Sequence, residues 1–144
     1  MMTKKILILD DDPGHQLLVS KLLHRSFVCD TILTSTLAEA KEKIQQHQFD
    51  VITLDGSVFH DEFGFQLIPA IRELQKPYCK IIMISSLQKY INSGLNVGDE
   101  YNSKQIFHAD YGFLKQEIIT CEGKVSFTER FEVILCKCDT HNST

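Results

Sequence analysis

Short runs of consecutive apolar residues alternate along the chain with segments whose apolar residues have helical spacing. Three such runs occupy residues 6–9, 51–54 and 81–84, and each is bounded by polar residues. Runs of this kind are typical of parallel strands that helices cover on both faces of a sheet. Residues 27–33 form a more polar run, which predicts an edge strand, and residues 113–114 are a candidate for a fifth strand.

Capping residues predict where the intervening helices begin. The candidates are Asp12 before Pro13, Thr36 with Glu39, and Ser126 with Glu129. A third helix, with an apolar stripe over residues 67–74, tolerates Pro69 only if it begins near Phe65. A further helix is expected around residues 87–93, followed by a loop, and Gly123 is expected to mark a turn.

The alternation of strands and helices predicts an α/β fold with a parallel sheet and right-handed crossovers. A length of 144 residues fits one domain. We therefore expect a single domain over residues 1–144, with a short polar tail at residues 139–144.

Composition excludes several classes of protein. The net charge is −4, and the lysines and arginines are scattered rather than gathered, which argues against direct nucleic-acid binding. No apolar run approaches the roughly 20 residues that a membrane span needs, and the first run is too short for a secretory signal. Five cysteines without such a signal predict reduced thiols and a cytoplasmic location. Cys136 and Cys138 do not have the spacing of a zinc site.

Polar side chains that can do chemistry follow the predicted strands, at the sheet edge where ligands bind in such folds. They are Asp10, Asp11 and Asp12 after the first strand, Asp55 after the third, Ser85 and Ser86 after the fourth, and Lys115 after the fifth. Neighbouring carboxylates repel one another and bind a hard divalent cation, usually Mg²⁺. A carboxylate beside Mg²⁺ and a lysine can accept a phosphoryl group, and a serine hydroxyl can then hydrogen-bond that group.

The segments KKILILDDDPGHQLLVSKLL, FDVITLD, KIIMISS and GFLK resemble the receiver domain of two-component response regulators, the CheY-like family. The resemblance covers nearly the whole chain. It implies a flavodoxin-like, doubly wound sheet of five parallel strands in the order 2-1-3-4-5. It also implies a cytoplasmic signalling protein rather than an enzyme, although such a domain catalyses its own phosphorylation and dephosphorylation.

The resemblance also assigns roles to individual residues. Asp55 is the implied phosphoacceptor and a metal ligand, Ser85 the switch hydroxyl, and Lys115 the contact to the phosphoryl group. The implied ligands of Mg²⁺ are Asp11 and Asp55 directly, Asp10 mainly through water, and the backbone carbonyl of Ser57. The implied partners are a sensor histidine kinase or a histidine phosphotransfer protein, a downstream protein target or a fused output domain, and possibly a second copy of the chain.

The sequence departs from the family in the loop after Asp55, which lacks the usual Pro, and in the longer segment before Lys115. Gln116 stands where a Pro usually follows the lysine, so a cis bond there would cost about 3 kcal/mol. Gly112 replaces the aromatic residue usual at that position. These departures leave open an atypical receiver that acts through protein contacts without phosphorylation.

Two further alternatives come from the same residues. Asp10 and Asp12, with Ser85 and Lys115, imitate the site of a haloacid-dehalogenase-type phosphohydrolase. A flavodoxin-type cofactor site fits less well, because adjacent carboxylates would repel a phosphate. His15 and His60 are both expected to be surface residues.

Overall fold

The computed structural model describes residues 3–59, 62–91 and 109–142. In chain order its elements are β1 (Lys4–Leu9), α1 (Pro13–Ser26), β2 (Cys29–Thr34), α2 (Leu37–Gln46), β3 (Val51–Asp55), β4 (Ser57–Phe59), β5 (Glu62–Phe63), the 3-10 helix η1 (Gly64–Leu67), α3 (Ile68–Leu74), β6 (Lys80–Ser85), β7 (Tyr111–Leu114), α5 (Lys115–Ile119) and α6 (Cys121–Asn142).

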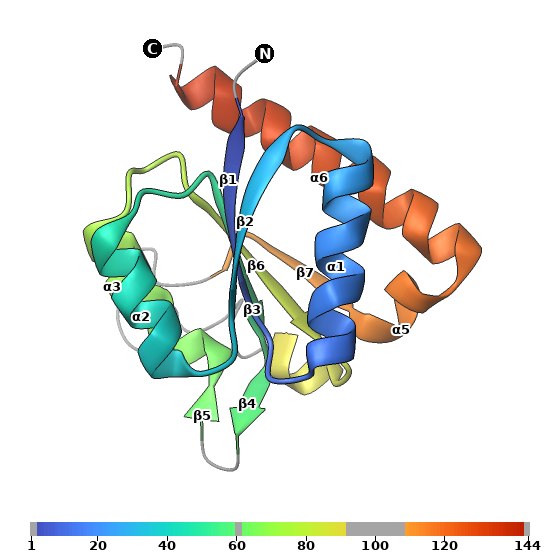
Figure 1. The fold of residues 1–144 in the computed structure, drawn as a ribbon, viewed down its shortest axis with the longest axis horizontal. Coiled ribbons are helices and arrows are strands. Elements are labelled where there is room, and N and C mark those ends of the chain that lie inside the picture. Colours follow the sequence, from blue (N-terminus) through green and yellow to red (C-terminus); the bar gives the residue numbers. More distant parts are fainter. Residues whose placement is uncertain (1–2, 60–61, 92–108, 143–144) are drawn as a thin grey trace.

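Five parallel strands form the central sheet in the order β2-β1-β3-β6-β7 (Figure 1). Numbered within this sheet alone, the order is 2-1-3-4-5, which confirms the predicted flavodoxin-like topology. The polar strand β2 lies at one edge, also as predicted. Strands β4 and β5 form a separate antiparallel hairpin, which the sequence pattern did not predict.

Each face of the sheet buries its own core, and β1 contributes alternately to both. Ile6 and Ile8 pack with residues of α1, α5 and α6, whereas Leu7 and Leu9 pack with residues of α2 and α3. All four side chains are fully buried, and each contributes about 1.5–3 kcal/mol of transfer free energy. Figure 1 shows the two helical layers on opposite sides of the sheet. None of the described helices has the length and apolar character needed to cross a bilayer.

Two predicted helix starts are confirmed. The Asp12 carboxylate accepts hydrogen bonds from the backbone N–H groups of Gly14 (2.9 Å) and His15 (3.4 Å), so α1 begins at Pro13. The Thr36 hydroxyl accepts a hydrogen bond from the Glu39 N–H at 3.1 Å and caps α2. These bonds satisfy backbone donors that have no partner within the helix.

The third helix was predicted to begin near Phe65, where the 3-10 helix η1 lies, but α3 itself begins later, at Ile68. Pro69 lies in the first turn of α3, after the 3-10 helix over Gly64–Leu67. A missing N–H is tolerated in a first turn because that group has no intrahelical acceptor. Of the helix expected over residues 87–93, residues 88–91 are helical. Leu87 is a bend, and residues 92–93, with most of the expected loop, lie outside the described residues.

The predicted start of the last helix was wrong. Helix α6 begins at Cys121 rather than near Ser126, because the Thr120 hydroxyl accepts a hydrogen bond from the Gly123 N–H at 2.9 Å. Gly123 therefore lies inside the helix and does not mark a turn. A Cβ atom at Gly123 would overlap the carbonyl oxygen of Glu117, so glycine permits the close packing of α5 against α6.

Candidate functional site

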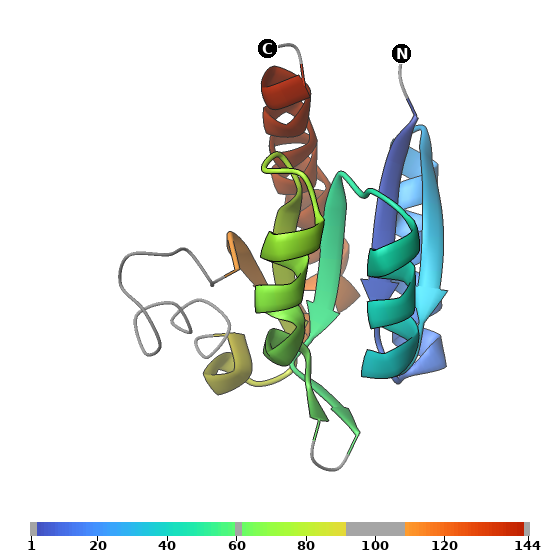
Figure 2. The same ribbon diagram turned by 90° about the vertical axis from the view of Figure 1, so that its left-hand side faces the viewer.

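The carboxyl ends of the parallel strands bring the predicted site residues to one edge of the sheet. Asp10 follows directly after β1, and Asp55 is the last residue of β3. Ser85 ends β6 and pairs with Leu114, so Lys115 follows at the same level. Figure 2 shows that this edge is the one from which the β4–β5 hairpin projects. The expected convergence of acids, hydroxyl and lysine is therefore present.

Three carboxylates form the centre of the site. Asp10, Asp11 and Asp55 each offer an oxygen atom, and these atoms all lie within 4.8 Å of one another. Asp10 and Asp55 are each 4% exposed, whereas Asp11 is more accessible. Buried like charges at this separation repel one another strongly unless a cation compensates them. An all-oxygen donor set of this kind fits a hard divalent cation such as Mg²⁺.

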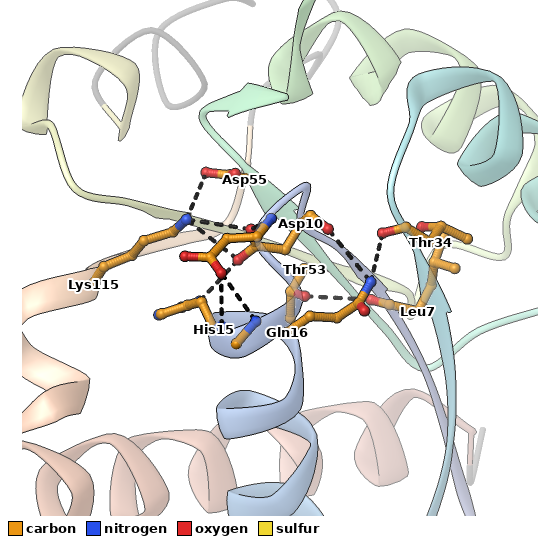
Figure 3. Close-up of polar contacts among 10 residues, drawn as sticks. Leu7, Asp10, His15, Gln16, Thr34, Thr53, Asp55 and Lys115 are labelled. Atoms are coloured by element: carbon orange, nitrogen blue, oxygen red, sulfur yellow. Dashed lines mark hydrogen bonds and ion pairs between the residues drawn. The ribbon is translucent and has the colours of Figure 1, made fainter. Parts of the chain in front are cut away.

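Lys115 is the ammonium group that bridges the two buried carboxylates. Its Nζ lies 3.3 Å from Asp10 Oδ2 and 3.4 Å from Asp55 Oδ1 (Figure 3). The second oxygen of Asp55, Oδ2, is buried and has no hydrogen-bond partner among the described residues. Lys115 therefore contacts two of the three carboxylates, and Asp55 Oδ2 is left without a partner among the described residues.

The surroundings shift the pKa values of the two buried acids in opposite directions. Burial, together with the charge of Asp10, raises the pKa of Asp55 to about 8. Burial also acts to raise the pKa of Asp10, but hydrogen bonds from His15 and from the Asp12 N–H, with the charge of Lys115, lower it overall. The lowered pKa of Asp10 favours its ionised form, whereas the raised pKa of Asp55 means that a nearby cation would favour its ionisation.

The surroundings of Lys115 favour its charged form. Burial acts to lower the pKa of this ammonium group, but the charges of Asp55 and Asp10 raise it overall. Lys115 therefore stays protonated and available to contact an anionic group at this edge.

His15 belongs to the site, and its prediction as a surface residue was wrong. It is only 9% exposed, and its Nδ1 lies 2.8 Å from Asp10 Oδ2. The Asp12 cap starts α1 at Pro13, so His15 lies in the first turn of the helix and its ring reaches Asp10. The signal in the sequence is spacing, because His15 precedes Val19 and Leu22 by four and seven residues and so lies on the buried face of α1. His60 lies outside the described residues.

Ser85 is buried beside the residue that follows Asp55. It is 2% exposed, and its hydroxyl accepts a hydrogen bond from the Leu87 N–H at 3.2 Å. A Cβ atom at Gly56 would lie 2.6 Å from Ser85 Oγ and would overlap Tyr90. A glycine at this position therefore permits the close approach of the Ser85 hydroxyl to the end of β3.

The β4–β5 hairpin occupies the place of the loop in which the sequence departs from the family pattern. The Gly64 N–H donates a hydrogen bond to the Gly56 carbonyl at 3.2 Å, and a Cβ atom at Gly64 would overlap the backbone carbonyl of Asp55. Ser57 opens β4 two residues after Asp55, and its carbonyl as a metal ligand stays a prediction. Alternating apolar and polar residues are too few here for a hairpin to be predicted from periodicity.

Two other sequence features now have structural explanations. The Asp12 carboxylate accepts hydrogen bonds from backbone N–H groups of α1 through Oδ1, so its role in the structure is that of a helix cap. The described residues contain no cis peptide bond, so the bond between Lys115 and Gln116 is trans. The Gln116 side chain donates a hydrogen bond to the Ser86 carbonyl at 3.0 Å and thereby joins the ends of β7 and β6.

Comparison with known structures gives matches that span almost the whole chain. A CheY-like receiver domain protein from Methanospirillum hungatei JF-1 is 20% identical, with a TM-score of 0.76 over 97% of this chain and 99% of that one. A response regulator from Thermotoga maritima is 22% identical, with a TM-score of 0.67 over 94% of this chain and 99% of that one. At these identities the likeness shows the fold.

A third similar structure is that of a response regulator from Burkholderia pseudomallei, which holds a phosphorylated aspartic acid, a calcium ion and citrate. It is 18% identical, with a TM-score of 0.60 over 88% of this chain and 72% of that one. No curated protein sequence matches the chain. The sequence model of the response regulator receiver domain matches residues 6–106, which include Asp10, Asp11, Asp55 and Ser85 but not Lys115. The chain belongs to the response regulator receiver domain family.

Proposed function

We propose that Asp55 accepts a phosphoryl group in a reaction that depends on Mg²⁺, and that the domain thereby switches its binding to a partner. One observation carries this proposal. Asp55 Oδ2 is buried without a partner among the described residues, at the centre of a carboxylate cluster whose lysine contacts the other oxygen, Oδ1. A buried acceptor without a hydrogen-bond partner destabilises the folded protein unless a ligand or an ion contacts it.

Asp55 and Lys115 would have different roles in the phosphoryl transfer. A carboxylate oxygen of Asp55 attacks the phosphorus of a phosphohistidine, the P–N bond breaks, and the imidazole nitrogen keeps the electron pair and takes up a proton. The products are an acyl phosphate on Asp55 and a free histidine on the donor. Lys115, which already lies 3.4 Å from Asp55, would contact the new phosphoryl oxygens. Positioning and electrostatics account for most of the catalysis of such transfers.

The carboxylates would hold the metal ion. Asp11 and Asp55, with the Ser57 carbonyl, are the proposed direct ligands, and Asp10 acts mainly through water. Bound Mg²⁺ would neutralise the charge of the phosphoryl oxygens and keep Asp55 ionised although its pKa is otherwise raised to about 8. The phosphorylated aspartic acid and the calcium ion in the Burkholderia pseudomallei structure support the same chemistry here.

Phosphorylation would act on the rest of the domain through Ser85. Its hydroxyl could turn from Leu87 to the phosphoryl group, and residues 88–91 follow it directly. Tyr90 in that segment packs against Phe63 of the hairpin, with ring centroids 5.4 Å apart. A shift of Ser85 would therefore move the partly exposed contact between Tyr90 and Phe63, which a partner protein could bind.

The partners follow from this role. We propose a sensor histidine kinase or histidine phosphotransfer protein as the phosphoryl donor, and a protein target or a fused output domain as the receiver of the signal. We further propose that residues 1–144 form one receiver domain and that it acts in the cytoplasm. Formation of a homodimer on phosphorylation is the alternative to binding a different protein.

Acetyl phosphate with Mg²⁺ provides the test, and intact-mass spectrometry provides the readout. The wild-type chain should gain the mass of one phosphoryl group, and EDTA should abolish the gain. Asp55→Asn should gain nothing, whereas Asp30→Asn, which removes an exposed carboxylate on β2, should behave as wild type. An unchanged adduct in Asp55→Asn would overturn the assignment. No adduct in any variant would favour a receiver that acts through protein contacts alone.

A further inference from the structure

We propose that His15 is a positioning residue of this site, which fixes the Asp10 carboxylate for Mg²⁺ binding and keeps Lys115 shared between Asp10 and Asp55. This inference rests on the proposed function, because it assumes that the carboxylate cluster binds Mg²⁺. It goes beyond the roles assigned above, in which Asp10 is a ligand through water and His15 has no part.

The hydrogen bonds of Asp10 show how tightly its carboxylate is held. Oδ1 accepts a hydrogen bond from the Asp12 N–H at 2.9 Å and lies 3.4 Å from Lys115 Nζ. Oδ2 lies 2.8 Å from His15 Nδ1 and 3.3 Å from Lys115 Nζ. The contact to His15 is thus the shortest that any side chain makes to Asp10 within the described residues. Figure 3 shows the carboxylate between the histidine and the lysine.

The buried surroundings of the ring determine which nitrogen carries its proton. The His15 side chain is 7% exposed, and Nε2 is buried without a hydrogen-bond partner among the described residues. A proton on Nε2 would have no acceptor, whereas a proton on Nδ1 is donated to a carboxylate oxygen. The geometry therefore favours the tautomer that donates from Nδ1, which is the one that orients Asp10.

Removal of this donor would act on the metal site through two residues. Without His15, Oδ2 of Asp10 keeps only the lysine, so the carboxylate can turn and draw Lys115 away from Asp55. Both changes alter the arrangement of negative charge that a cation meets. Residues that orient a metal-binding carboxylate or imidazole typically contribute about 10- to 100-fold to metal affinity.

Three variants of the full chain separate positioning from packing. His15→Leu keeps a buried side chain but removes the donor. His15→Asn places an amide N–H close to the position of Nδ1 and so restores the donor. His24→Leu is the matched control, because His24 lies on the same helix, is exposed, and bonds Thr31 rather than the site. Mg²⁺ affinity is measured by titration calorimetry, and thermal unfolding is followed in the same samples.

We expect His15→Leu to weaken Mg²⁺ binding about 10- to 100-fold. His15→Asn should recover most of that loss, and His24→Leu should bind as wild type. In the metal-free wild type, nitrogen NMR of the imidazole ring should show the proton on Nδ1. A purely structural role would instead lower the unfolding temperature of His15→Leu and leave Mg²⁺ affinity unchanged.

Several results would overturn the inference. Equal Mg²⁺ affinity in wild type and His15→Leu would do so while leaving the proposed function intact. If His15→Leu fails to fold, the NMR measurement and His15→Asn decide, and either a proton on Nε2 or weak binding by His15→Asn contradicts the inference. If the wild-type chain itself binds no Mg²⁺, the proposed function fails first and the role of His15 fails with it.

Discussion

Replacement of Asp55 by Asn should stabilise the metal-free protein near pH 8, although it removes the central residue of the site. Asn keeps nearly the shape of Asp but carries no charge, so it relieves the repulsion between Asp55 and Asp10. The substitution also leaves the ion pair of Lys115 with Asp10, at 3.3 Å, in place. A residue that is needed for function would then be one that costs stability in the absence of its ligand.

The magnitude follows from the pKa of Asp55, which is raised from 3.8 to about 8. One pKa unit corresponds to about 1.4 kcal/mol, so the charged form costs the folded state at most about 6 kcal/mol. Loss of the Asp55 contact to Lys115 and local relaxation offset part of this, so we expect a net gain of about 1–3 kcal/mol. For a domain of this size that gain raises the unfolding temperature by about 2–4 °C for each kcal/mol.

The sign of the pH dependence is fixed by the direction of the shift. Because the folded-state pKa of Asp55 lies above the unfolded value, the folded state retains a proton that the unfolded chain has released. The contribution of Asp55 to stability is therefore complete below its ordinary pKa of 3.8 and is lost as the pH rises towards about 8. The Asp55→Asn variant has no carboxyl group to ionise at this position. Its unfolding free energy should therefore exceed that of the wild type by an amount that grows between pH 3.8 and about pH 8.

Urea unfolding in EDTA, followed by circular dichroism from pH 5 to pH 8.5, measures the effect. Asp30→Asn serves as the control for removing one negative charge from an exposed site. Added Mg²⁺ should reduce the difference in unfolding free energy between Asp55→Asn and the wild type, because it stabilises the wild type alone. An Asp55→Asn variant that is no more stable than wild type at pH 8, with an unchanged pH dependence, would refute the reasoning.

Three further predictions follow from the same contacts. Lys115→Met should slow phosphorylation by acetyl phosphate at least about tenfold, because it removes the ammonium group from beside Asp55 and Asp10; an unchanged rate would contradict the role of the lysine. Gly64→Ala should destabilise the protein by about 2–4 kcal/mol in urea unfolding, because its Cβ would overlap the Asp55 carbonyl, whereas Gly14→Ala, whose Cβ meets Asp12 at an ordinary 3.4 Å, should be nearly neutral. Mg²⁺ affinity measured by calorimetry should rise between pH 6 and pH 8, with protons released on binding, because the carboxyl group of Asp55 must ionise; a constant affinity would argue against Asp55 as a ligand.

Much of the fold could be predicted because its strands are continuous apolar runs. A strand buried on both faces needs apolar residues at every position, and β1 satisfies this by sending Ile6 and Leu7 to opposite cores. The order of acids, serine and lysine along the chain then predicts which residues meet at the carboxyl edge. Local caps such as Asp12 and Thr36 were predictable because they act within three residues of themselves.

The rest could not be predicted because it depends on contacts between distant residues. The spacing of His15 from Val19 and Leu22 predicts a buried position, but only the contact to Asp10 shows that the ring belongs to the site. Ser126 has the pattern of a helix cap, but Thr120, six residues earlier in the chain, provides the cap. The close approaches at Gly56 and Gly64 depend on how β3, β6 and the hairpin pack, which no local pattern records.

The most direct test of the central claim is to locate the phosphoryl group on the chain. The protein is phosphorylated with acetyl phosphate and Mg²⁺, the acyl phosphate is reduced with borohydride, and the peptides are sequenced by mass spectrometry. The account predicts that reduction converts Asp55 to homoserine and leaves Asp10 and Asp11 unchanged. Conversion at Asp10 or Asp11, or at a residue outside the carboxylate cluster, would contradict it.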